Sequence, residues 1–361
     1  MRLASLQSIE PGVKLARPLL DEKGIVLLGE GVELSSFLLK RLNGMGITSA
    51  YIEDGRTEDI VVEDVISQQT RQEAIGLVNE TLHQITSAER FPRHYQQPQF
   101  GRKVRDLFDV ILHEMREKDD LVINLANIYT TDGELYHHSV NVSLMALAIG
   151  MEYGLSEKQL LDLGVGTLLH DVGKLQVPPE ILNKPGRLTP EEFEVVKGHA
   201  QFGYDLLRAQ DDISPVSAHV ALQHHEKVDG TGYPRGLGGR DMHIFGKITA
   251  VADVYEALTA NRVYRQGQLP HLALELLLGA CGTHFDKEIV ELFLGTIAIY
   301  PLGMTVVLNT GETGVIAALN RHHPQRPVVR ILKDRAGQDL KLPYHVNLLE
   351  HLTTLIVKCE V

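Results

Sequence analysis

The chain has 361 residues, of which 43% are hydrophobic and 23% are charged, a composition typical of a soluble globular protein with two or three structural units. Lys and Arg number 35 against 47 Asp and Glu, which gives a net charge of -12. This charge disfavours binding to a nucleic-acid polymer, because such binding depends on neutralising phosphates. We find no apolar run near the roughly 18 residues that a membrane helix needs, no signal-peptide pattern, and no metal or disulfide spacing of the two cysteines. We therefore expect a cytoplasmic protein without a membrane segment.

Four segments follow one another along the chain. Residues 1–65 alternate short β-like stretches with one short helical pattern, which predicts a small α+β accessory module. Residues 66–118 have a polar, helical pattern and are expected to form a helical linker. From 119 to 298 the hydrophobic period is helical nearly throughout, and residues 299–361 form a β-rich C-terminal extension. The predicted fold is mainly α, with an all-α core between small β-rich N-terminal and C-terminal modules.

Local signals place several elements inside these segments. Ser156 with Gln159, and Thr189 with Glu192, have the spacing of capping boxes, and the second pair encloses a first-turn proline. A helical pattern over 35–42 ends at a glycine. The expected strands are 25–28, 50–52, 305–308, 314–316 and 327–332.

Histidines and carboxylates recur within the helical segment. A lone histidine on an apolar helix face is usually a satisfied core residue, but here that explanation would be needed five separate times. The pair His170-Asp171 follows one apolar run and Asp253 follows another, and burying such groups is costly unless each is hydrogen-bonded or bound to a metal. We therefore expect these residues to converge on one cavity. The candidates are Glu134, His138, His170, Asp171, Lys174, His199, His224, His225 and Asp253.

The spacing of these residues suggests more than one metal ion. Glu134 and His138 are four residues apart and would share a helix face; His170 and Lys174 have the same spacing. On a helix, the adjacent His224 and His225 would diverge by about 100°, which favours two neighbouring ions over one. A His and Asp set without Cys suits Fe, Mn, Zn or Ni. Such a set favours a two-metal site of the kind that hydrolyses phosphoesters.

Two further segments each allow two interpretations. The glycine-rich loop 229–234 is either a tight turn, since glycine tolerates positive φ, or a ligand-binding loop. Arg262 and Arg265, which follow Asp253, either lie on a solvated helix face or hold phosphate or base groups.

Together these segments resemble the signature of HD-GYP domains, which are bacterial cyclic di-GMP phosphodiesterases within the HD hydrolase superfamily. The main matches are His170-Asp171-Val172-Gly173-Lys174, His224-His225-Glu226 and the loop that ends in Gly232-Tyr233-Pro234. The segments 138–142, 184–189 and 253–259 match as well, so the resemblance covers roughly residues 119–298. One departure is Val263, where the family usually has proline; it bears on ligand positioning and not on metal binding.

The resemblance implies a role for each matched residue. Asp171 stands in the position that bridges two metals, and Lys174 matches a lysine that contacts the scissile phosphate. Glu134 stands where members with a third metal carry an additional ligand. The metal ligands implied are Glu134, His138, His170, Asp171, His199, His224, His225 and Asp253. The substrate contacts implied are Asp132, Lys174, Tyr233, Pro234, Arg262 and Arg265.

The activity implied is hydrolysis of cyclic di-GMP to pGpG, and by a second cut to GMP, with two or three divalent metal ions, Fe or Mn. One alternative is an HD-superfamily hydrolase of another nucleotide, against which the Gly-Tyr-Pro loop and the two arginines weigh. The other is a non-catalytic cyclic di-GMP receptor, although such members usually lose ligands and this sequence keeps them. Residues 1–65 could sense a signal, form a homodimer or dock to a diguanylate cyclase with a GGDEF domain, and the sequence does not choose among these.

Overall fold

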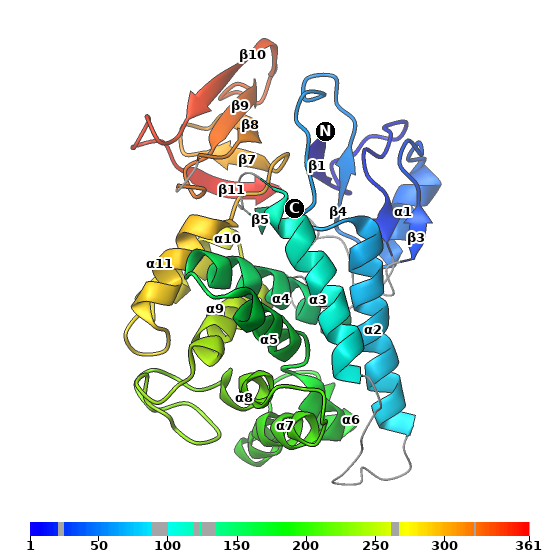
Figure 1. Cartoon of the computed structure of the whole chain (residues 1–361). Coiled ribbons are helices and arrows are strands. Elements are labelled where there is room, and N and C mark those ends of the chain that lie inside the picture. The colour runs from blue at the N-terminus through cyan, green and yellow to red at the C-terminus, as the bar shows by residue number, and fades with distance from the viewer. Residues whose placement is uncertain are drawn as a thin grey trace.

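The computed structural model describes residues 1–20, 25–87, 100–118, 123–124, 134–260, 267–320 and 323–360. Its centre is a bundle of helices, with a small module from the N-terminal part of the chain and an antiparallel sheet from the C-terminal part at one end (Figure 1). The predicted fold class, mainly α with small β-rich modules at the two ends of the chain, is confirmed.

The helical core is built around one apolar helix, α4 (Glu134–Glu152). Its residues from Val140 to Gly150 are buried around the full circumference, as expected of a helix that is apolar on all sides. It packs against α5 (Glu157–Leu168) and α9 (Ile244–Thr259). The other elements of the bundle are the 3₁₀ helix η2 (Val172–Gln176), α6 (Pro179–Leu182), α7 (Pro190–Arg208), α8 (Pro215–Gln223), α10 (Pro270–Gly279) and α11 (Lys287–Thr296).

The two predicted capping boxes begin helices α5 and α7. The Thr189 hydroxyl accepts from the backbone N–H of Glu192 at 3.2 Å, and the Glu192 carboxylate accepts from the Thr189 N–H at 2.7 Å. The Ser156 N–H donates to the Gln159 side chain at 2.9 Å. These contacts satisfy backbone N–H groups that have no partner within the helix.

Two long helices run beside the bundle, α2 (Gln68–Ser87) and α3 (Phe100–Arg116) (Figure 1). Phe108, Ile111 and Met115 on α3 are buried at helical spacing and form an apolar face of this helix. Gly164 of α5 lies so close to the Phe108 ring that an added Cβ would come within 2.5 Å of it. Helix α2 packs against α3 and α4.

The N-terminal module has its own small apolar core. Strand β1 (Arg2–Ser5) pairs antiparallel with β4 (Ser49–Ile52), β2 (Leu19–Leu20) pairs with β3 (Val26–Leu28), and α1 (Ser36–Gly44) covers them. The strands expected at 25–28 and 50–52 and the helix expected at 35–42 are thereby confirmed within one or two residues.

The C-terminal part forms a five-stranded antiparallel sheet in the order β10-β9-β8-β7-β11. Its strands are β7 (Thr305–Leu308), β8 (Thr313–Ala318), β9 (Val328–Lys333), β10 (Asp339–Asn347) and β11 (Ile356–Glu360). The Leu3 N–H donates to the Gly303 carbonyl at 2.7 Å, and Arg330 pairs with Asp59 at 2.5 Å. The N-terminal module and the sheet are therefore in direct contact.

A short parallel pair joins the segment before the core to the segment after it: β5 (Ile123–Asn124) lies beside β6 (Ile297–Ala298). Among the described helices, none combines the length and the apolar character needed to cross a membrane.

Candidate metal centre

Five elements of the bundle bring histidines and aspartates to one buried point. His138 lies on α4, His199 on α7 and Asp253 on α9. His170 and Asp171 occupy the turn between α5 and η2, and His224 is the C-cap of α8, followed by His225. His170 is completely buried, and most of the others are nearly so. Segments 115 residues apart in the chain thus meet at one site.

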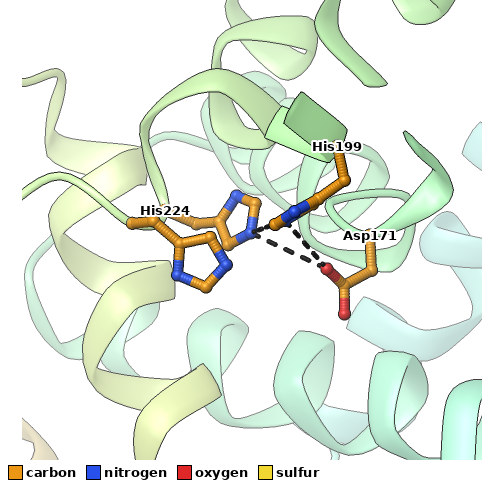
Figure 2. Close-up of side chains that lie close together, drawn as sticks. Asp171, His199 and His224 are labelled. Carbon is orange, nitrogen blue, oxygen red and sulfur yellow. Dashed lines mark hydrogen bonds and ion pairs between the residues drawn. The ribbon is translucent and has the colours of Figure 1, made fainter. Parts of the chain in front are cut away.

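The first group of ligand atoms surrounds one oxygen of Asp171. Its Oδ1 lies 3.5 Å from His199 Nε2 and 3.7 Å from His224 Nε2. Figure 2 shows the side chains of Asp171, His199 and His224 pointing toward one another. With His225, these residues offer four ligand atoms that all lie within 4.8 Å of one another.

The second group surrounds the other oxygen of the same carboxylate. Asp171 Oδ2 lies 3.4 Å from His170 Nε2 and 3.7 Å from His138 Nε2. Asp253 Oδ1 lies 3.2 Å from His138 Nε2 and 3.8 Å from His170 Nε2. Asp171 therefore stands between two sets of histidines, with one oxygen facing each set.

Backbone carbonyls orient three of the imidazole rings. The Nδ1 of His170 donates to the Thr167 carbonyl at 2.6 Å, that of His199 to Val196 at 2.7 Å, and that of His224 to Val220 at 3.1 Å. A carbonyl can only accept, so each Nδ1 carries the proton and each Nε2 presents a lone pair to the cavity. This is the usual arrangement of metal-binding histidines.

The donor set fits divalent metal ions. His170 Nε2 and Asp171 Oδ1 are buried without a hydrogen-bond partner, which is costly for polar atoms unless something else satisfies them. His199 Nε2 and His224 Nε2 lie only 3.2 Å apart; since both present lone pairs, a cation between them would relieve their repulsion. Imidazole and carboxylate donors without thiolates suit Fe, Mn, Zn and similar ions.

Glu256 also belongs to this centre, although the sequence reasoning gave it no role. Its Oε2 accepts from His138 Nδ1 at 2.5 Å, and its Oε1 accepts from Asn141 Nδ2 at 3.4 Å. Arg71 of α2 in turn donates to Asn141 Oδ1 at 3.1 Å. The available signal was spacing, since Glu256 follows Asp253 by three residues and Asn141 follows His138 by three, which places each pair on one helix face.

Burial and mutual charge set the protonation of the cluster. Burial alone would raise the pKa of Asp171, but the ammonium of Lys174 and the surrounding histidines lower it well below its ordinary value. Burial lowers the pKa of His199 and His224, and it lowers that of His225 to about 4. These rings are therefore neutral near pH 7, as metal ligation requires.

His138 behaves in the opposite way. Burial lowers its pKa, but Glu256 and Asp253 outweigh that effect and raise the pKa to about 10. In the absence of a cation, His138 is thus protonated between two carboxylates. A bound divalent ion would take over the role of that proton.

Lys174 approaches the same carboxylate from the open side. Its Nζ donates to Asp171 Oδ2 at 2.5 Å, and its side chain is 27% exposed. The four-residue spacing predicts that Lys174 shares a helix face with His170, and this is wrong because α5 ends at Leu168 and η2 begins at Val172. The turn between the two helices instead aims both side chains at Asp171.

The expectation that His224 and His225 diverge along a helix is also wrong. Helix α8 ends at Gln223, and the two rings lie with centroids 4.0 Å apart. Both contribute to the same four-residue group with Asp171 and His199. The helix end rotates the second ring toward the first, so the pair can address one ion.

The Gly-Tyr-Pro loop lies directly against the cluster. The Tyr233 ring stacks on His225 with centroids 4.7 Å apart, while Pro234 is exposed. Glu226 holds the loop by accepting from the backbone N–H groups of Arg235 at 2.7 Å and Leu237 at 2.9 Å. This part of the loop thus forms a wall of the site.

The remaining predicted residues cannot be placed. Asp132, Arg262 and Arg265 lie outside the described residues, and Glu134 is known only as the first residue of α4. Their roles stay predictions.

Comparison with known proteins agrees with this geometry. Residues 120–289 match the HD domain family, and this range contains every residue of the two groups. Over these residues the chain is similar to HD domains. Residues 305–360, which form the C-terminal sheet, match the family described as a KOW domain associated with an HD domain. The motifs that resemble those of HD-GYP domains all lie within the range that matches the HD domain family.

Several curated proteins are similar to part of this chain. The chain is 35% identical over 226 residues to a cyclic di-GMP phosphodiesterase of Pseudomonas aeruginosa, covering 63% of this chain and 54% of that protein. It is 38% identical over 174 residues to a cyclic di-GMP phosphodiesterase of Thermotoga maritima, covering 48% and 47%. It is 37% identical over 187 residues to a 3′3′-cGAMP-specific phosphodiesterase of Vibrio cholerae, covering 51% and 36%. The chain thus spans about half the length, or less, of these relatives.

Proposed function

We propose that this protein is a metal-dependent phosphodiesterase that hydrolyses cyclic di-GMP to linear pGpG. The observation that carries the proposal is the carboxylate of Asp171, which directs one oxygen toward His199 and His224 and the other toward His138 and His170. A carboxylate shared between two histidine sets could hold two metal ions close together, as in the two-metal sites that hydrolyse phosphoesters. The names of the curated relatives support the substrate class.

The residues that would hold the metals are those that the structure brings together. His199, His224, His225 and Asp171 would hold one ion. His138, His170 and Asp253, with the second oxygen of Asp171, would hold the other. Divalent ions at such a site supply Lewis-acid polarisation of a phosphoryl oxygen and lower the pKa of a bound water.

The protein's own groups orient and stabilise the substrate. Lys174, partly exposed beside Asp171, is placed to neutralise charge that develops on a phosphoryl oxygen. Tyr233, stacked on His225, would exclude water from one side of the phosphodiester. Asp132, Arg262 and Arg265 are proposed as further substrate contacts, with the arginines holding phosphate or guanine edges.

The number and identity of the metals are part of the proposal. The His and Asp donor set suits iron, manganese or zinc, and we propose iron or manganese, as the resemblance implies. Glu134 begins the helix that carries His138, one turn earlier, and we propose it as a ligand of a third ion. Protein prepared without oxygen should then contain three equivalents of metal, and Glu134→Ala should lose one of them while keeping some turnover. A wild-type protein that saturates at two equivalents would exclude the third site and leave the two-metal proposal intact.

A second candidate substrate is 3′3′-cGAMP, because relatives of similar identity are specific for that dinucleotide. Hydrolysis of cyclic di-GMP and 3′3′-cGAMP under the same conditions would rank the two. Further cleavage of pGpG to GMP, a cytoplasmic location, a homodimer and a GGDEF-domain partner remain proposals from the resemblance.

The deciding experiment combines turnover with metal analysis. Metal-loaded protein should convert cyclic di-GMP to pGpG, and Asp171→Ala should abolish turnover and lower the metal content. His137→Ala is the matched control, since His137 is adjacent to His138 but belongs to neither histidine set; it should retain both properties. A metal-loaded wild type that binds cyclic di-GMP without cleaving it would instead make the protein a receptor.

A further inference from the structure

An aromatic and cationic surface lies beside the metal centre, where helix α7 meets the Gly-Tyr-Pro loop. It consists of Phe193 and Lys197 on α7 together with Tyr233. The Phe193 ring meets the Tyr233 ring edge to face, with centroids 6.2 Å apart. The Lys197 ammonium lies 5.1 Å from the centroid of Phe193 and 5.8 Å from that of Tyr233.

This surface is continuous with the candidate catalytic site. Tyr233 stacks on His225 on one side and contacts Phe193 on the other. The carboxylates of the metal centre also act on its phenol group: burial together with the charges of Asp171 and Asp253 raises the pKa of Tyr233. The Tyr233 ring thus links Phe193 to His225, one of the proposed metal ligands. A nucleoside whose phosphate lies at the metal centre can span this separation with its base.

Phe193 is 44% exposed. Singly exposed apolar side chains are ordinary on protein surfaces, but this one is held in place by two neighbours. Lys197 covers part of its ring and is itself fixed by Glu194, whose Oε1 accepts from Lys197 Nζ at 2.6 Å. A ring that is pre-oriented and exposed beside a phosphodiester site has the properties of a stacking platform for a base.

We propose that Phe193 is the stacking position for a purine base of the bound cyclic dinucleotide, and that Lys197 supplies positive charge beside it. The inference rests on the proposed phosphodiesterase function, because the base is attached to the phosphate that the metal centre cleaves. Stacking tolerates any base since every base has a π face. Phe193 should therefore strengthen binding of guanine and adenine dinucleotides alike, and other residues must select between them.

The kinetic test compares two phenylalanines of the same helix. Phe193→Ala should raise KM for cyclic di-GMP about tenfold, the size expected when one stacking contact is removed, with metal content and kcat near those of the wild type. Phe193→Tyr should restore KM. Phe202 is the matched control, because it is 40% exposed and nine residues later, about half a helical turn away in direction; Phe202→Ala should leave KM unchanged. A KM for Phe193→Ala within twofold of the wild type overturns the proposal.

A spectroscopic test separates this inference from the proposed function. The chain contains no tryptophan, so Phe193→Trp and Phe202→Trp each introduce a single fluorescent reporter. Cyclic di-GMP, or GMP if the wild type turns over no cyclic di-GMP, should quench the reporter at 193 and not the one at 202. Quenching without turnover supports the purine position while the phosphodiesterase proposal fails. Turnover by the Phe193→Trp protein with no quenching at saturating cyclic di-GMP overturns the purine position alone.

Discussion

The carboxylate of Asp171 can serve two groups of histidines because of where it stands in the chain. It lies in the turn after α5, one residue beyond His170, and its two oxygens face side chains from α4 on one side and from α7 and α8 on the other. The position of Asp171 between the two groups therefore depends on the turn between α5 and η2.

Glu256 is expected to act on metal affinity through His138. Because its carboxylate accepts from His138 Nδ1, it fixes the ring with Nε2 toward Asp171 and Asp253. Glu256→Ala should weaken metal binding about ten- to a hundredfold, the range found for partners of ligating histidines. Glu256→Gln, which keeps an accepting oxygen, should recover part of that loss. A chelator competition titration measures both.

The control for this experiment is Glu152→Gln, at the exposed C-terminal end of the same helix that carries His138. It should leave metal affinity unchanged. If Glu256→Ala binds metal as tightly as this control, the hydrogen bond to His138 is only structural.

At the residue scale, the sequence predicts which side chains form the metal centre, but not which residues hydrogen-bond to them. His170, Asp171 and Asp253 stand out because each follows an apolar run, and a buried polar group needs a partner. Glu256 and Asn141 do not stand out in this way. Their contact with each other joins two helices through residues that are 115 positions apart in the chain. Only the packing of α4 on α9 brings them together.

Among the elements, η2 is fixed against α7 by a glycine. A Cβ at Gly173 would lie 2.0 Å from the backbone carbonyl oxygen of His199 and 2.6 Å from the backbone nitrogen of Gly203. Both are backbone atoms of α7, so they cannot move aside independently. This close approach sets the distance from His199 to Asp171, which lies two residues before the glycine, and to Lys174, which follows it directly.

Gly173→Ala should therefore separate η2 from α7. We expect a loss of stability of about 1–3 kcal/mol, typical of overpacking in a core, together with weaker metal binding. Thermal unfolding and a metal titration of the same preparation measure the two effects. Gly76→Ala is the control, since Gly76 lies within α2 with nothing within 4 Å of an added Cβ; it should be neutral or slightly stabilising. Full metal affinity in Gly173→Ala would contradict this account.

Helix starts were predictable where a side chain caps the backbone, as at Thr189 and Ser156. Helix ends were harder to predict. No sequence signal marks the end of α8 at Gln223, and a helix continued through His224 and His225 predicts the wrong direction for the second ring. Beyond the helix end, Glu226 holds the following loop through contacts over nine and eleven residues, which hydrophobic periodicity does not predict.

Across the whole molecule, the two ends of the chain meet outside the helical core. Thr305 donates to the Leu3 carbonyl at 2.8 Å and Tyr51 donates to the Leu302 carbonyl at 3.0 Å, contacts that span 302 and 251 residues. The sequence indicates both modules from their strand and turn signals. It contains no local feature that predicts their contact, because that depends on the length and direction of every helix between them.

The whole molecule should also be sensitive to acid when it is free of metal. His199, His224 and His225 have pKa values lowered by burial, whereas unfolded histidine titrates near pH 6.5. Below that pH the unfolded chain binds more protons than the folded chain, so stability falls as pH falls. For His225, the free energy of unfolding decreases as pH falls from about 6.5 to about 4, by roughly 1.4 kcal/mol per pH unit.

His138 contributes with the opposite sign. Its pKa is raised to about 10, so its stabilising effect is complete below pH 6.5 and is lost as pH rises toward 10. Within the cluster, the loss of stability between pH 6.5 and 4 therefore comes from the three histidines with lowered pKa values. Outside the cluster, His219, His243 and His284 add to it, because burial lowers their pKa values as well. The aspartates of the cluster do not offset it, because their unfolded pKa lies near 3.9, below this window.

Thermal melts of chelator-treated protein at pH 7, 6 and 5 should show a falling Tm, and His225→Gln should make the decline shallower by the contribution of one proton. The slope against pH is the quantity to compare, since the substitution also changes the absolute Tm. Restoring metal should raise Tm most at pH 7, where the ligands are already neutral, and progressively less at pH 5, where protons compete for them. An unchanged slope in His225→Gln would mean that His225 takes up its proton at the same pH in the folded and the unfolded chain, which would contradict a pKa lowered by burial.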